Sequence, residues 1–168
     1  MDGELLDLSN EANYHITLRM KTESGFSTEE AEKERNEMIR PPVRCRIMVV
    51  DDMKTNLQML RGILEPLYDV ILMKSGHQAL LYLKKHPAPD LVLMDIDMPE
   101  MDGIETAKHI MEMTDHTVPI LFVTALCDRQ TVTLCRNLDA AGYIVRPYKP
   151  VFVKTEIKRI LMGRSEIE

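Results

Sequence analysis

Long apolar runs and a basic secretion signal are both missing from this sequence. No stretch approaches the roughly 18 to 20 apolar residues that span a bilayer, and the chain starts with Met1-Asp2-Gly3-Glu4. Cysteines are few: Cys45, Cys127 and Cys135 are odd in number and form no C-x-x-C pair, which indicates neither a disulfide framework nor a zinc site. We therefore expect a cytoplasmic protein without a membrane partner, and we interpret the cysteines as buried apolar thiols.

An excess of positive charge is absent as well. The net charge of -6 argues against a broad phosphate-binding surface, so we expect no direct contact with nucleic acid. Internal repeats and low-complexity tracts are also missing. The 168 residues, 45% of them hydrophobic, suffice for one ordinary core, which predicts one folded domain.

The acidity is concentrated in residues 1–42, which hold 10 acidic and 5 basic side chains. Pro41-Pro42 marks the boundary, because proline lacks an N–H donor and disfavours helix in the residue before it. A capping-box pattern predicts a short charged helix from Thr28 to Ile39. We interpret residues 1–42 as an acidic N-terminal extension, partly helical or disordered, with a docking or dimerisation arm as the alternative. The folded domain then covers residues 43–168.

Short apolar runs alternate with helical periodicity from residue 43 onward, which is typical of an α/β fold. The predicted strands lie near residues 45–50, 69–73, 90–94, 118–123 and 142–145. Strands this apolar, separated by helices, favour a parallel sheet that is covered on both faces. Right-handed crossovers leave few topologies, and we predict the flavodoxin-like, doubly wound five-stranded sheet with strand order 2-1-3-4-5.

The helices between these strands show core-facing stripes at helical spacing. The three clearest stripes are Leu57, Leu60, Leu64 and Leu67 after the first strand, Ile104, Ala107 and Met111 after the third, and Val153, Ile157, Ile160 and Leu161 at the end of the chain. Residues 76–86 and 128–140 have weaker patterns. We predict helices there too, because they complete five strand–helix repeats.

Four of the predicted strands end at polar residues whose side chains can bind a ligand or take part in a reaction. Asp51-Asp52 follows the first strand, Asp95 the third, Thr124 the fourth and Arg146 the fifth. The carboxyl ends of parallel strands share one edge of the sheet, and the order 2-1-3-4-5 places its switch point beside the first and third strands. The sequence therefore predicts that these side chains converge there.

Crowded carboxylates need a cation, because two like charges about 4 Å apart repel by about 4 kcal/mol at an effective dielectric of 20. Mg²⁺ suits the site, since it prefers hard oxygen ligands and commonly combines one or two carboxylates with a phosphate. Calcium is disfavoured, because the sequence lacks a twelve-residue loop that ends in a bidentate glutamate. With Mg²⁺ holding a phosphoryl donor, one aspartate can act as a nucleophile.

Several motifs together resemble a response-regulator receiver domain of a bacterial two-component system. They are VVDD at 49–52, LVLMDIDMPEMDG at 91–103, FVTA at 122–125 and GYIVRP at 142–147. The resemblance covers roughly residues 44–162. Each motif is weak alone, but all four occur in order at the ends of predicted strands.

The resemblance implies roles for seven of these residues. Asp95 accepts phosphate from a histidine kinase or phosphotransfer protein, and Asp51, Asp52, Asp95 and the main-chain carbonyl of Asp97 bind Mg²⁺. Thr124 senses the phosphoryl oxygens, Tyr143 is the switch aromatic, and Arg146 completes the site. The face made by the fourth helix, fifth strand and fifth helix then changes conformation, which would signal to a downstream partner or a fused output domain and can support a homodimer.

Arg146 departs from the family, which normally has lysine at this position, followed by a proline whose preceding peptide bond is usually cis. Guanidinium is planar, bulkier and permanently charged, so it can bind phosphate bidentately or rest against a carboxylate and block entry. Lys149-Pro150 is a second Lys-Pro pair, but using it would shift the last strand out of register. We prefer Arg146 in the site, and the alternative is a receiver-like module that is never phosphorylated.

A magnesium-dependent phosphohydrolase of the haloacid-dehalogenase type is an alternative from another class, indicated by the D-x-D pattern of Asp95 and Asp97. That enzyme would need Asp97 as an acid or base beside the nucleophile. However, Pro99 stands where threonine or valine is usual, and the first strand adds an extra acidic pair. We therefore favour a receiver that is not an enzyme beyond self-catalysed phosphoryl transfer and autodephosphorylation.

Overall fold

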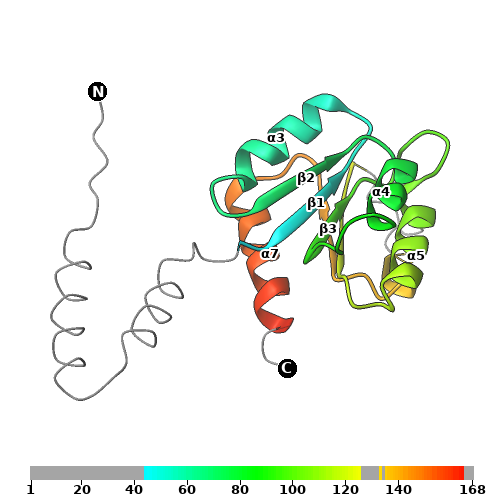
Figure 1. Cartoon of the computed structure of the whole chain (residues 1–168). Helices are drawn as coiled ribbons and strands as arrows, with labels where there is room; N and C mark the ends of the chain where they lie inside the picture. The colour runs from blue at the N-terminus through cyan, green and yellow to red at the C-terminus, as the bar shows by residue number, and fades with distance from the viewer. Residues whose placement is uncertain (1–43, 126–132, 134, 165–168) are drawn as a thin grey trace, which may run out of the picture. The chain divides into compact units, whose positions relative to one another are not determined.

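A five-stranded parallel sheet forms the centre of the computed structural model, which describes residues 44–125, 133 and 135–164 (Figure 1). Its strands are β1 (Arg46–Val50), β2 (Asp69–Met73), β3 (Leu91–Met94), β4 (Ile120–Thr124) and β5 (Gly142–Val145). The strand order is β2-β1-β3-β4-β5, and every neighbouring pair is parallel. The predicted fold class and strand order are confirmed.

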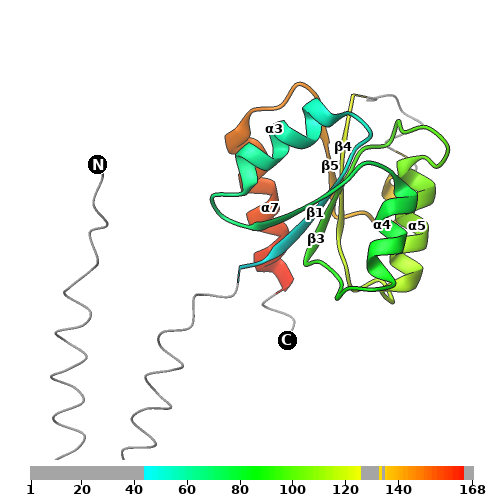
Figure 2. The same ribbon diagram turned by 45° about the horizontal axis from the view of Figure 1, so that its top comes forward.

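Helices cover both faces of this sheet. They are α3 (Lys54–Leu64), α4 (Gly76–Leu83), α5 (Gly103–Met113) and α7 (Pro150–Arg164). Figure 2 shows α3 and α7 on one side of the strands and α4 and α5 on the other. Among the described residues, no helix combines the length and the apolar character that a membrane span needs.

Alternating side chains of the strands build two cores, because successive residues of a strand point to opposite faces. In β1, Met48 and Val50 belong to the cluster that includes α4 and α5. Ile47 and Val49 belong to the cluster that includes α3 and α7. Both faces of β1, β3 and β4 are therefore buried away from water. Polar residues next to these strands in the sequence can reach water or polar partners only where the strands end.

Most of the predicted stripe residues are buried, and two predictions fail. Leu67 is 51% exposed, because α3 ends at Leu64 and a turn carries the chain away from the core before β2. Cys45 is only partly buried, since it lies just before the amino-terminal end of β1. Cys135 is buried as predicted. Cys127 lies outside the described residues, as do 128–132 and 134 of the helix predicted at 128–140. Of the described residues in that range, 133 and 135–137 are helical.

Gly103 lets the start of α5 pack directly on the end of β3. Its N–H donates to the carbonyl of Ile96 at 2.9 Å, and a Cβ added to it would lie 1.9 Å from the main-chain oxygen of Asp95. Asp102 caps the same helix, accepting a hydrogen bond from the Glu105 N–H at 2.7 Å. The position of Asp95 therefore requires glycine at residue 103, because any larger residue would place its Cβ against the main chain of Asp95.

Replacing Gly103 with alanine is expected to lower the free energy of unfolding by about 1–3 kcal/mol, because the new methyl group meets main-chain atoms that no rotamer change can move. Urea denaturation followed by circular dichroism measures this change. Gly62→Ala in α3 is the matched control: nothing lies within 4 Å of its added Cβ, so a gain of about 0.5–1 kcal/mol is expected. Equal changes in the two variants would contradict the prediction.

Candidate functional site

Main-chain hydrogen bonds of the sheet bring the strand ends together. Val50 is in register with Met94, so the next residues, Asp51 and Asp95, lie side by side. The Asp95 N–H donates to the carbonyl of Val50 at 2.9 Å, and the Arg146 N–H donates to the carbonyl of Thr124 at the same distance. The predicted convergence at the carboxyl edge is therefore present in the structure.

Three carboxylates form the acidic part of the site. One oxygen from each of Asp51, Asp52 and Asp95 lies within 4.8 Å of the others. Asp51 is 1% and Asp95 5% exposed, whereas Asp52 is exposed to solvent. These are hard oxygen ligands at a spacing that one divalent cation can bridge, so the donor set fits Mg²⁺.

Asp51 accepts hydrogen bonds from donors at the start of α3. The Met53 N–H donates to Oδ1 at 2.9 Å, and Asn56 Nδ2 lies 3.0 Å from Oδ1 and 3.1 Å from Oδ2. Sequence reasoning missed Asn56. Its place in the first turn of α3, five residues after Asp51, was the available signal, because asparagine donates readily to a nearby carboxylate.

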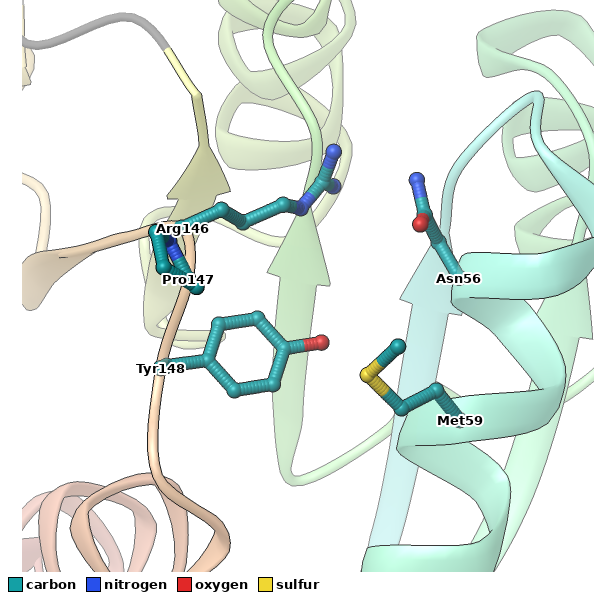
Figure 3. Close-up of a pocket in the computed structure, with 5 residues that line it drawn as sticks. All are labelled: Asn56, Met59, Arg146, Pro147 and Tyr148. Atoms are coloured by element: carbon teal, nitrogen blue, oxygen red, sulfur yellow. The ribbon is translucent and has the colours of Figure 1, made fainter.

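The guanidinium of Arg146 contacts two of the three acids, Asp51 and Asp95. Its Nη2 atom is 2.5 Å from Asp51 Oδ2 and 3.4 Å from Asp95 Oδ1, and it donates to the carbonyl of Val123 at 3.0 Å. Figure 3 shows its side chain extending from the end of β5 across the ends of the neighbouring strands. Among the described residues, its buried Nε has no hydrogen-bond partner. The Arg146–Pro147 peptide bond is cis.

Burial changes the acidity of Asp95. Loss of hydration raises its pKa to about 6, the nearby Arg146 charge lowers it in part, and the charge of Asp51 raises it. The N–H of Ile96 donates to Asp95 Oδ1 at 2.9 Å and also favours the charged form. Asp95 is therefore ionised at neutral pH but holds its proton more strongly than an exposed aspartate does.

The structure also describes the other predicted site residues, Thr124, Asp97 and Tyr143. Thr124 ends β4 and is 1% exposed, and the Asp97 side chain is exposed in the loop after β3. Tyr143, in β5, is 44% exposed and lines a cavity of about 560 Å³ with Lys149 and Phe152, among other residues. Lys149 thus lines the cavity beside β5 and α7. The basic side chain that pairs with the carboxylates of Asp51 and Asp95 is that of Arg146.

A smaller cavity opens directly beside Arg146. It has a volume of about 290 Å³ and is lined by Asn56, Met59, Arg146, Pro147 and Tyr148 (Figure 3). In Figure 3 the Tyr148 hydroxyl group points across this space toward Met59. Burial raises the pKa of Tyr148, so its hydroxyl stays neutral at physiological pH.

Comparisons with known proteins agree with this geometry. The family model described as the response regulator receiver domain matches residues 47–158. The alkaline phosphatase synthesis transcriptional regulatory protein PhoP of Bacillus subtilis is 36% identical over 123 residues, which cover 73% of this chain and 50% of PhoP. This chain spans about half the length of PhoP and of several other regulators that it matches.

Shorter relatives match over nearly their whole length. The polar-differentiation response regulator DivK of Brucella ovis is 32% identical over 112 residues, covering 65% of this chain and 90% of DivK. The structure of the BeF3-activated receiver domain of DrrB from Thermotoga maritima has a TM-score of 0.64 and 27% identity, and the match covers 71% of this chain and 99% of DrrB's. These matches support neither a phosphohydrolase nor a module that is never phosphorylated.

Proposed function

This chain belongs to the response regulator receiver family, a regulatory module of two-component signalling, and on that premise we propose that Asp95 is its phosphoacceptor. One observation carries the proposal: the Asp95 carboxylate lies at the carboxyl edge of the sheet, with oxygens of Asp51 and Asp52 and the guanidinium of Arg146 around it. The family relation and this grouping of charges point to the same residue.

The cofactor we propose is Mg²⁺, held by Asp51, Asp52, Asp95 and the main-chain carbonyl of Asp97. When bound, it would offset the negative charge that builds up between the carboxylates and an incoming phosphoryl group. Asp95 is ionised at neutral pH despite its raised pKa of about 6, so one of its oxygens can attack phosphorus. A P–O bond forms, the P–N bond to the donor histidine breaks, and the imidazole takes up a proton.

The signal would then pass through Thr124 and Tyr143. A phosphoryl group adds about -1.5 to -2 charge and three strong acceptor oxygens beside Asp95. The Thr124 hydroxyl can donate to those oxygens if it moves toward them, which leaves space for the half-exposed Tyr143 ring to turn inward. We infer that partners read the face that combines the helix predicted at residues 128–140, part of which lies outside the described residues, with β5 and α7.

The partners that follow are a histidine kinase or phosphotransfer protein as donor, and a downstream protein or a fused output domain as reader. PhoP, which is a transcriptional regulator, is about twice the length that this chain matches, so an output domain fused to such a receiver has a precedent among its relatives. A homodimer through the face of residues 128–140, β5 and α7 belongs to the same proposal. We infer no catalytic activity beyond self-catalysed phosphoryl transfer and autodephosphorylation.

Intact-mass spectrometry with acetyl phosphate tests the proposal. With Mg²⁺ present, the full chain is expected to gain the mass of one phosphoryl group, because the small donor bypasses the kinase and requires only the site. Excess EDTA is expected to abolish the gain, since the carboxylates then lack the cation that offsets their charge. No mass gain at any Mg²⁺ concentration would overturn the proposal.

A further inference from the structure

The Asp51 carboxylate has no hydrogen-bonding capacity left for a metal ion while Arg146 stays in place. A carboxylate offers about four lone-pair directions, two on each oxygen. Met53 and Asn56 donate to Oδ1, and Asn56 and Arg146 approach Oδ2. Asp51 is therefore saturated by the protein itself, whereas Asp52 is exposed to solvent.

Arg146 occupies the direction from which a cation would reach Asp51. Its Nη2 atom lies 2.5 Å from Oδ2 and 3.4 Å from the Asp95 carboxylate, so it bridges two of the three acids. Mg²⁺ would need an oxygen at about 2.0–2.1 Å and would also be repelled by the guanidinium charge. A divalent cation that approaches Asp51 Oδ2 therefore competes with Arg146 for that oxygen.

The guanidinium is anchored more firmly than an ammonium group in its place would be. Its planar group carries five donors in a fixed arrangement, and Nη2 also donates to the carbonyl of Val123 at the end of β4. A guanidinium group is permanently charged in proteins. The exchange with a metal must therefore occur by movement of the side chain.

The structure provides a place for the displaced group. The cavity of about 290 Å³ already has Arg146 in its wall, together with Met59 and Tyr148 (Figure 3). The aromatic ring of Tyr148 gives a cation a favourable surface, and the aliphatic stem of arginine packs well on apolar side chains. Because Arg146 already forms part of the wall, this cavity is the space nearest to its side chain on the side away from the acids.

We propose that Arg146 is a resident competitor of the divalent cation: it neutralises Asp51 and Asp95 in the resting state, and metal binding requires it to swing into the cavity beside Tyr148. The inference rests on the proposed function, because it concerns the regulation of the same site. Its consequence is a high Mg²⁺ requirement, so that phosphorylation begins only at concentrations that displace the guanidinium.

Mg²⁺ titrations of the full chain, followed by isothermal calorimetry and by amide shifts of the ¹⁵N-labelled protein, test the competition without any phosphoryl donor. Arg146→Lys keeps the charge but loses the planar fork, and it is expected to bind Mg²⁺ more tightly by on the order of 10-fold, the range of one charge-assisted hydrogen bond. Arg146→Ala is expected to bind at least as tightly as Arg146→Lys. The spectra also establish that each variant is folded.

Arg159→Lys is the matched control, because Arg159 is exposed in α7 and pairs with Glu156. It is expected to bind Mg²⁺ with wild-type affinity, and an increase equal to that of Arg146→Lys would overturn the inference. Unchanged or weaker binding in Arg146→Lys would also overturn it, while labelling by acetyl phosphate would leave the proposed function standing. Tighter binding in Arg146→Lys without labelling of any variant would instead support the competition and reject the phosphoacceptor role.

Discussion

Replacing Asp95 with asparagine is expected to abolish labelling by acetyl phosphate completely. The amide is close in size to the carboxylate but is not a nucleophile that can form an acyl phosphate. The other two acids of the cluster differ from Asp95 in their surroundings: Asp51 is engaged by Met53, Asn56 and Arg146, and Asp52 is exposed to solvent. Intact-mass spectrometry under the conditions that label the wild type measures the loss.

Asp97→Asn is the matched control for this loss. Asp97 lies two residues from Asp95 and its side chain is exposed, and the proposal uses only its main-chain carbonyl, so the variant is expected to keep one label per chain. Loss of the label in Asp97→Asn would point to a role of that carboxylate in the transfer. A label that persists in Asp95→Asn would move the acceptor to another residue, which peptide mapping would identify.

The sequence predicted the sheet well because burial on both faces leaves a strong pattern. β1, β3 and β4 are continuous apolar runs, and each ends at the first residue whose side chain needs water or a polar partner. Since parallel strands end at one edge, the identity of those residues also predicted that Asp51 and Asp95 would be neighbours. The parallel register of β1 and β3 confirms this.

The partners of individual side chains could not be predicted in this way. The sequence left open whether Arg146 would face a phosphate or a carboxylate, because that choice depends on distances between strand ends and not on their order. The predictions for Leu67 and Cys45 failed for a related reason: each residue continues a local apolar pattern, but Leu67 lies in the turn after α3 and Cys45 lies before the first residue of β1. Gly103 was part of a matched motif, yet its close approach to Asp95 is visible only in three dimensions.

Charge at the site explains why one arginine does not replace the metal. Arg146 carries one positive charge, whereas Asp51, Asp52 and Asp95 together carry three negative charges when ionised. A phosphoryl donor brings further negative charge toward them, and neighbouring charges interact strongly in a partly buried site. Arg146 can therefore stabilise the resting state, while the proposed phosphoryl transfer would still need a divalent cation.

The raised pKa of Asp95 predicts that the folded chain loses stability as the pH rises. Its pKa is about 6 in the folded state, against 3.8 for an ordinary aspartate. Between these values the unfolded chain has released the proton and the folded chain keeps it, so the free energy of unfolding falls with increasing pH. Above about pH 6 the full penalty is about 3 kcal/mol, at 1.36 kcal/mol for each pKa unit.

Urea denaturation in EDTA at about pH 4.5 and about pH 7.5 measures this dependence, and Asp95→Asn isolates it. Because asparagine does not ionise, the variant is expected to gain stability relative to the wild type as the pH rises, with most of the gain complete near pH 7. Asp97→Asn, whose side chain is exposed, is expected to follow the wild type. A stability difference between Asp95→Asn and wild type that stays constant with pH would show that burial does not hold the proton on Asp95.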